Sequence, residues 1–469
     1  MRNLGLLLGS VACVVSGAVS PGCSDGSDAC PDAAALQARL DTAAPGDTVS
    51  LGACTIAGPL TVPAGVRLQG AGSDQTTVSA GDRSRAVTLL PGEPPATVAD
   101  LAVESDGCAG IVAVGAGRVA IESVEVRASR GVGVALEGLS GADIRAVDVR
   151  GPIDAATADT VSPPRPPFGC GSSPLATHGI VLVDVAGASL SAVTVEGLAA
   201  FGVVAVRSTI AWTDGSVSDG LGAGFEILGG SAQLDRVTVS GMRHGAGATE
   251  SFGGVIAGGA DVTTTDLVVD GNAGFGLLHD GSSAVHTGLS ALDNGFAAAW
   301  AQSMTAFEIV GASTLEDNAF AGVVAIDSTG VVLRGGVVSG TVEGVRVSGV
   351  RTVRAADGVS LVSSDATLEG LELVSNDRVG VLVDLGGGSS ASVALDGVAV
   401  DGTGTELGVI GQNGTLAAGW DDGVTRAGAT VGNDAAFTGT LPVGDAVGPP
   451  CFPPAGLLGT SGIAPLTDP

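Results

Sequence analysis

Residues 179–206 read GIVLVDVAGASLSAVTVEGLAAFGVVAV, and this stretch decides the fold. Gly179 opens a run of apolar, mostly β-branched residues, and Gly202 opens a similar run 23 residues later. Between the two runs lies a second alternating segment, SAVTVEG. Short segments of this kind, bounded by Gly, Asp and Asn, are typical of strands and turns. The stretch therefore predicts a repeating unit built from short strands.

The same unit recurs through most of the chain. Its first strand opens at the following glycines: Gly110, Gly131, Gly179, Gly202, Gly224, Gly254, Gly274, Gly295, Gly322, Gly344, Gly380 and Gly408. Most steps lie between 20 and 28 residues, so a coil of about 22 residues stacks on the next at about 4.8 Å. Counted from these glycines, Val203, Phe225 and Phe275 are expected to share one interior column. Asn272, Asn294, Asn318 and Asn376 fall near the preceding corner, where their amides are expected to stack.

This organisation resembles the right-handed parallel β-helix of the pectate lyases and of the wider parallel β-helix repeat group. The start of the chain resembles that group too, because PDAAALQARLDTA at 31–43 is typical of a capped amphipathic helix with Asp32 as N-cap. The resemblance implies an all-β fold, a right-handed parallel β-helix solenoid of about 12 or more coils with an N-terminal capping helix. It leaves the function open, because this scaffold carries lyases, hydrolases, epimerases, adhesins and spacers.

The N-terminus has the composition of an export signal. Arg2 precedes an apolar stretch that runs to Val19, and Ser20-Pro21-Gly22-Cys23 follows. This arrangement resembles a bacterial lipoprotein signal, in which Cys23 would be lipidated; ordinary cleavage is the alternative. We expect the chain to be exported, either as a lipoprotein at the outer membrane or cell surface or as a secreted protein, and to meet the membrane only through the lipid anchor.

The predicted organisation is a signal peptide at 1–22, a tether at 23–29, a β-helix at 30–432 and a Pro/Gly-rich tail at 433–469. Residues 30–56 form the N-terminal cap of the β-helix, and loop insertions interrupt it at 151–177 and 242–253. An exported protein sits where disulfides persist. Cys30 with Cys54 is the easiest local pair, and Cys170 and Cys451 lie in matching Pro-Phe settings. Cys108 with Cys170 is the competing pair.

Charge limits the partners. The 469 residues include 49 acids and 20 bases, which gives a formal charge of −29, and all the bases are arginine. Phosphate backbones bind cationic surfaces, so nucleic acid is an unsuitable partner. An acidic surface of this kind suits cations, neutral sugars or solubility alone. We expect a monomer whose partner is a polysaccharide or another component of the cell envelope.

One sheet is predicted to be apolar on both faces. Val181, Val204 and Val324 alternate with the interior residues and should face outward. A sheet with two apolar faces is normally covered on both. The insertion at 151–177, the tail at 434–469 and a partner chain are the candidates for the cover.

A polar ladder is expected at the end of the same strands, five residues after each opening glycine. Its members with binding chemistry are Asp184, Arg207, His279, Trp300 and Asp327. Asp184 and Arg207 are expected to be neighbours, and His279 beside Trp300 would form a sugar-stacking or acid/base pair. These are the candidate ligand-binding residues.

The candidate catalytic residues lie in the second insertion. Arg243, His244 and Glu250 (in MRHGAGATESFG, 242–253) would flank a groove with the first insertion, because long loops on a rigid scaffold often carry function. A lyase would also need a cation to spread developing charge, so the cofactor stays open, with Ca²⁺ as the candidate. The P-loop, the G-x-S-x-G elbow and the H-E-x-x-H motif are all absent from the sequence.

Two functions follow from these observations. The first is a cell-envelope β-helix lipoprotein that binds a surface polysaccharide or another envelope component without catalysis. The alternative is a polysaccharide lyase, glycoside hydrolase or epimerase that acts in a groove between the two insertions. Convergence of the candidate catalytic residues on one point would favour the enzyme, and their separation would favour binding.

Overall fold

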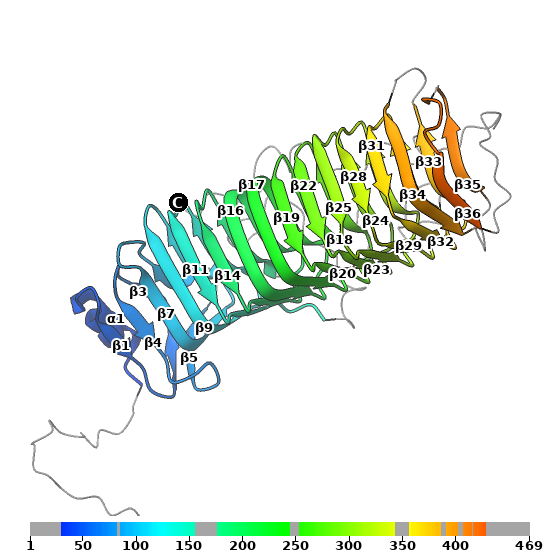
Figure 1. The fold of residues 1–469 in the computed structure, drawn as a ribbon. Helices are drawn as coiled ribbons and strands as arrows, with labels where there is room; N and C mark the ends of the chain where they lie inside the picture. Colours follow the sequence, from blue (N-terminus) through cyan, green and yellow to red (C-terminus); the bar gives the residue numbers. More distant parts are fainter. Residues whose placement is uncertain are drawn as a thin grey trace, which may run out of the picture.

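The computed structural model describes residues 30–81, 85–154, 176–243, 253–342, 356–385, 391–401, 407–414 and 416–427. Within them the chain forms one helix, α1 (Ala33–Thr42), and 36 strands that all belong to one continuous sheet. The strand pairs are parallel and join each coil to the next, so the sheet winds into a solenoid of about 14 turns (Figure 1). The predicted parallel β-helix is therefore confirmed.

The winding divides this continuous sheet into three parallel faces, to each of which a coil contributes. We call these faces sheets A, B and C in chain order. Sheet A contains β3 (Leu60–Val62), β6 (Arg85–Leu89), β8 (Ala109–Val114), β10 (Gly131–Glu137), β13 (Ala176–Val183), β18 (Gly253–Gly258), β21 (Phe275–Asp280), β24 (Ala297–Gln302), β27 (Ala321–Ile326), β30 (Asp357–Val362), β33 (Val379–Asp384) and β35 (Leu407–Gln412). Sheet B contains β1 (Thr48–Ser50), β4 (Arg67–Gln69), β11 (Gly141–Arg145), β14 (Ala188–Ser191), β19 (Asp261–Thr265), β22 (Ser283–Thr287), β25 (Ala306–Val310), β28 (Val331–Arg334) and β31 (Ala366–Glu369).

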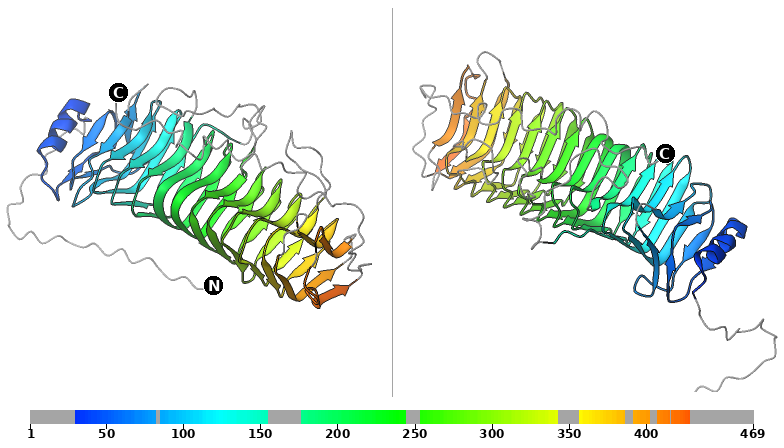
Figure 2. Two further views of the ribbon diagram at one scale, coloured as in Figure 1. Left: turned by 90° about the horizontal axis from the view of Figure 1, so that it is seen from above. Right: turned by 180° about the vertical axis from the view of Figure 1, so that it is seen from behind.

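Sheet C contains β2 (Cys54–Ala57), β5 (Thr76–Ala80), β12 (Asp148–Arg150), β15 (Thr194–Glu196), β20 (Val268–Asp270), β23 (Ser290–Leu292), β26 (Thr314–Glu316), β29 (Val337–Ser339), β32 (Glu372–Val374) and β36 (Gly423–Ala427). Five longer strands bend from one sheet into another. Strands β7 (Ala96–Ser105), β9 (Arg118–Ala128) and β34 (Val393–Asp401) pass through B and C, and β16 (Phe201–Ser218) and β17 (Ala223–Ser240) pass through all three. The sheets run side by side along the whole body (Figure 2).

The interior is one apolar column, because inward side chains of successive coils lie directly above one another. Val203 pairs with Phe225 in register, and both are fully buried in the central core. Phe275 was expected in this column but lies on the outside of sheet A, among a second apolar cluster. The register explains the difference, because Phe275 aligns with Gly253 and its neighbour Gly276 takes the corner position that the sequence prediction gave to Gly274.

Helix α1 covers the N-terminal end of the column (Figure 1). It begins after Asp32, whose side chain accepts a 2.7 Å hydrogen bond from the Ala35 amide, so the predicted N-cap is confirmed. Leu36 and Leu40 face the core and are fully buried. Gln37 uses its side-chain amide to bond both backbone groups of Thr61, at 2.8 and 3.0 Å, and so continues the hydrogen bonding of β3. The helix thus takes the place of a preceding coil next to β3.

Three of the four asparagines predicted to stack do so at the corner before sheet A. Asn376 instead donates to the Val338 carbonyl at 3.2 Å, and its Oδ1 atom has no partner among the described residues. Asn272 donates to Asn294 at 3.0 Å, Asn294 donates to Asn318 at 2.8 Å, and all three are buried. Each amide also donates to a backbone carbonyl, as Asn294 does to Val269 at 3.0 Å. The ladder satisfies backbone groups of a corner that has no strand partner there.

The corner glycines are required by close packing. A side chain on Gly202 would place its Cβ 2.2 Å from a methyl group of Val217, and one on Gly224 would stand 2.2 Å from Val239. Sheet C therefore packs against the bare backbone of sheet A at this corner. This contact, rather than a left-handed backbone, accounts for the repeated glycine at these two positions.

The outer face of sheet A is covered, as its composition predicts. Val181, Val204 and Val324 face outward, and their exposed fractions are 0%, 2% and 0%. The tail at 434–469 lies outside the described residues, as does most of the insertion at 151–177, so the choice among the proposed covers stays a prediction.

The cysteine prediction needs a correction. Cys30 and Cys54 are both free thiols and do not form the predicted pair. Cys54 packs against the interior from β2, whereas Cys30 is exposed ahead of α1, so the two side chains occupy different environments. Cys108 is disulfide-bonded. Cys23, Cys170 and Cys451 lie outside the described residues.

Candidate functional site

The polar ladder marks the corner that follows sheet A. Asp184, Arg207 and Asp327 have φ angles of 53°, 48° and 48°, in the left-handed region that most residues avoid. The same position is occupied by Gly229, Gly259, Gly281 and Ser303 on the coils between them. The backbone at this corner selects mainly glycine, aspartate and serine, and Arg207 is the exception.

Asp184 and Arg207 are neighbours, as predicted. The Arg207 guanidinium donates from Nε and Nη2 to the two carboxylate oxygens of Asp184, at 2.7 and 2.6 Å. This pairing lowers the pKa of Asp184. Both side chains are exposed, so the pair is a surface ion pair with both charges already matched. Asp327 lies five rungs further along the ladder, about 24 Å from Arg207.

His279 and Trp300 do not belong to the ladder. The predicted ladder was out of phase on these two coils, because the corner positions there are Gly276 and Ala298. His279 therefore points into the core and Trp300 points to the outer face of sheet A. The two rings lie on opposite faces of one sheet and form no sugar-binding pair.

Trp300 belongs instead to an aromatic cluster on the outer face. Phe296 stacks on Phe320 with centroids 4.5 Å apart, and Phe275 meets Trp300 edge-on at 5.7 Å. All four rings are buried, and no described residue bonds the indole nitrogen of Trp300. Aromatic clusters of this kind add stability beyond the buried area. The cluster therefore stabilises the outer face of sheet A, which was predicted to be covered.

Glu226 is the residue that sequence reasoning missed on this face. It occupies an outward position of β17 between Val204 and Ile256, and only 6% of it is exposed. No described residue donates a hydrogen bond to its carboxyl or pairs with it. Burial raises its pKa to about 7. The sequence contained one signal of this buried acid, a glutamate inside the segment GFEIL. Other coils have valine or leucine at the equivalent outward position.

A second buried polar group lies nearer the C-terminal end of the same face. Arg378 donates to both carboxylate oxygens of Asp357, at 2.7 and 2.5 Å, and Ser360 donates to the same carboxylate at 2.5 Å. Asp357 is fully buried, so this pair is desolvated and held by hydrogen bonds on several sides. Sequence reasoning missed it because the residues come from two coils.

Two histidines meet inside the core. His279 and His286 approach each other with their Nε2 atoms 3.2 Å apart, and Thr264 bonds the Nδ1 atom of His286 at 3.0 Å. Phe307 packs against both rings. Burial lowers the pKa of His279 to about 4, and burial together with His279 lowers the pKa of His286. Both rings are therefore neutral at physiological pH and unreachable by a ligand.

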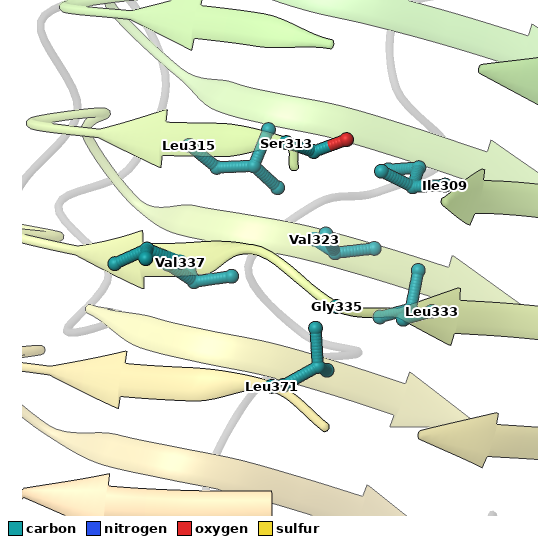
Figure 3. A pocket seen from close by; sticks show the side chains of 9 residues that line it. Ile309, Ser313, Leu315, Val323, Leu333, Gly335, Val337 and Leu371 are labelled. Atoms are coloured by element: carbon teal, nitrogen blue, oxygen red, sulfur yellow. The ribbon is translucent and has the colours of Figure 1, made fainter. Parts of the chain in front are cut away.

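The interior also contains a small cavity between successive coils (Figure 3). It measures about 10 Å³ and is lined mainly by apolar side chains, among them Ile309, Leu333 and Leu371. That volume is at the lower limit for one water molecule. The hydroxyl of Ser313 at its edge already bonds the Leu289 amide and the Val310 carbonyl. The cavity is a packing defect of the core.

The candidate catalytic residues are only partly described. His244 and Glu250 lie outside the described residues. Arg243 lies beside Leu221 at the corner before sheet A, and its Nε atom is buried without a described partner. Arg207 lies at the opposite end of the sheet A strands, so roughly 20 Å of strand separates the two arginines. The structure does not bring Arg207 and Arg243 together.

The outward residues of sheet C form hydroxyl-rich columns, which we call the hydroxyl face. Ser216 pairs in register with Thr238, and Ser290 pairs with Thr314 further along. The adjacent column contains Ser218, Ser240, Asp270, Glu316 and Ser339. These side chains are half-buried or exposed, and those on neighbouring rungs lie one above another along the axis of the solenoid. Apolar residues interrupt both columns, at Val268 and Val337 in the first and at Leu292 and Val374 in the second.

Other ligand chemistry is limited in the described part of the chain. No three His, Cys, Asp or Glu side chains there are grouped as ligands for a metal ion. Nor does any helix among those residues have the length and apolar character needed to cross a membrane.

Comparison with known proteins identifies no family for the chain. No family model matches, and no curated protein matches. Several solved structures are similar in fold. The A-module of the mannuronan C-5 epimerase AlgE6 from Azotobacter vinelandii is 18% identical, over 84% of this chain and 94% of that one, with a TM-score of 0.39.

Two further structures have similar scores. The catalytic unit of the GH87 α-1,3-glucanase from Streptomyces thermodiastaticus is 12% identical over 80% of this chain and 65% of that one, with a TM-score of 0.44. The N-terminal fragment of gene product 12 of bacteriophage phi29 is 14% identical over 86% and 69%, with a TM-score of 0.45. Similarities of this size concern the fold and assign no activity.

Proposed function

We propose that this protein is an exported β-helix of the cell envelope that binds a polysaccharide without catalysis. The observation that carries the proposal is the hydroxyl face, where serine and threonine hydroxyls on neighbouring rungs lie one rung spacing apart on a rigid surface, in columns that apolar residues interrupt. A linear polymer of sugars also repeats along one axis, and its hydroxyls exchange hydrogen bonds with hydroxyl and carboxylate side chains. Repeated weak contacts along both chains then add up to useful affinity.

The positions of the charged residues support binding over turnover. Arg207 is already paired to Asp184, and Arg243 lies at the far end of the same strands, so these arginines share no reaction centre. The acidic surplus favours a neutral or cation-bridged glycan over a strongly acidic one. In this proposal the protein is a monomer, and a lipid on Cys23 tethers it to the envelope.

Binding of the mature chain to a panel of neutral and acidic polysaccharides tests the proposal. We expect retention of at least one glycan and no release of unsaturated or reducing ends. The triple change Ser216→Ala, Thr238→Val and Thr314→Val should weaken that binding at least tenfold, because it removes three hydroxyls and keeps the strands. A matched change on sheet B, Thr263→Val with Thr265→Val and Thr287→Val, should leave binding unchanged.

Two results would overturn the proposal. One is failure to bind any envelope glycan at high protein concentration. The other is sugar release that Arg243→Ala or His244→Ala abolishes, which would establish the lyase, hydrolase or epimerase instead. The tether is tested separately, because Cys23→Ala should move the protein from the membrane fraction to the soluble fraction if Cys23 carries a lipid.

A further inference from the structure

The pair His279–His286 is a buried ionisable group placed in the middle of the solenoid. In sheet A of the described chain, eight coils precede β21 and five follow it. Both side chains have an exposed fraction of 0%. The 3.2 Å contact between the Nε2 atoms requires that one ring donates and the other accepts, so the two rings share one proton at this contact. A second proton there would break the bond and place two like charges together.

Nothing around the pair would compensate such a charge. The inward residues of the strands that flank His279 in sheet A are Val255 and Ala257 on β18 and Ala299 and Ala301 on β24. The inward residues beside His286 in sheet B are Val262, Thr264, Phe307 and Ile309, and sheet C contributes Val269 and Ala291. None of these described residues is titratable. The Nδ1 atom of His279 also lacks a partner among them.

We propose that this histidine pair is an acid-sensitive opening point, at which the central coils β18–β25 open locally while the coils on either side stay closed. A solenoid permits such local opening because each coil contacts only its neighbours. The opened segment exposes the two imidazoles to water, where they can be protonated. Burial prevents this protonation while the core is closed.

The sign of the effect follows from the protonation states. The opened histidines titrate near 6.5, whereas the closed pair has a lower pKa, about 4 for His279. Between these values only the open state binds protons, so opening becomes more favourable as the pH falls below 6.5. Each histidine contributes about a tenfold change per pH unit, and the pair about a hundredfold.

Hydrogen exchange of the whole mature chain, read as protection factors between pH 7 and 4.5, tests the proposal. We expect protection in β21 and β22 to fall about 100-fold or more between pH 6.5 and 5, ahead of any loss in β14 and β15. The double change His279→Leu with His286→Leu should abolish this fall. Leucine suits both positions, because Leu182 and Leu234 occupy the same interior columns on earlier coils.

Single and control variants keep the outcome decisive. His286→Leu alone should reduce the loss of protection to about tenfold over the same interval. The control His178→Leu removes a histidine on the outer face of sheet A and should leave the acid response of β21 and β22 unchanged. The proposal is wrong if the double variant opens at the same pH as the wild type. It is also wrong if the ends of the solenoid lose protection before its centre does.

Discussion

Single positions of the coil are chosen by backbone geometry and by solvation. The corner after sheet A holds a left-handed residue on most coils, and Asp184, Ser303 and Asp327 occupy it with φ near 50°. The beginning and end of this ladder were predictable from the repeat, but its middle was not, because the corner residues of those two coils are Gly276 and Ala298 and not Gly274 and Gly295. An error of two or three residues moved a core histidine and an outer tryptophan onto the surface.

Glu226 provides a test at the same scale. Its pKa of about 7 in the folded chain exceeds the usual value of 4.5, so the folded state holds a proton that the unfolded state has released. The free energy of unfolding therefore falls as the pH rises from 4.5 to 7 and is constant above that. We expect Glu226→Gln to raise the free energy of unfolding by about 3 kcal/mol at pH 8 relative to its effect at pH 4.

Chemical denaturation at the two pH values measures this difference. The matched control is Glu196→Gln, an exposed position of β15, which should change stability by less than about 0.5 kcal/mol at either pH. An equal effect of Glu226→Gln at pH 4 and pH 8 would show that the carboxyl is not buried as described.

At the scale of elements, each sheet is stabilised by its stacking on the coils above and below. The asparagine ladder connects three corners that have no strand pairing of their own, through Asn272, Asn294 and Asn318. The ladder was predictable because asparagine recurs at the repeat distance, and the repeat distance is itself visible in the sequence. The ion pair Asp357–Arg378 was not predictable, because nothing in the repeat marks these two residues as partners.

Removal of the middle asparagine tests the ladder. Asn294→Ala leaves the buried amide of Asn272 without its acceptor and the Val269 carbonyl without a donor. We expect the free energy of unfolding to fall by about 2–3 kcal/mol, measured by chemical denaturation. Gln233→Ala, at an exposed position of β17, is the control and should change stability by less than about 0.5 kcal/mol. A loss no larger than the control's would mean that water or the backbone replaces the ladder.

At the scale of the whole molecule, the fold is a stack in which each coil depends on its neighbours and the first coil depends on α1. Leu36 and Leu40 close the end of the apolar column, and Gln37 bonds the edge of β3. A stack without such a cap would present open strand edges and an apolar surface to solvent. The helix therefore protects both the first coils and the solubility of the chain.

Leu40→Asp tests this capping role. We expect hydrogen exchange to accelerate in β1–β5 at the N-terminal end, while β17 and the coils beyond it keep their protection, because coupling reaches only near neighbours. Light scattering should also detect end-to-end association of the exposed coils. Ala38→Asp introduces the same side chain on the exposed side of α1 and should do neither. Uniform loss of protection along the chain would contradict the proposed independence of distant coils.

The sequence by itself determined the solenoid, its repeat, its capping helix, its asparagine ladder and its doubly apolar sheet. These features follow from local chemistry that recurs every coil, and recurrence is visible in one dimension. Only the tertiary structure decided which way His279, Phe275 and Trp300 point, that Glu226 is buried alone, and that Arg207 and Arg243 lie apart. Those facts depend on the register between coils, in which a shift of one residue exchanges the two faces of a strand.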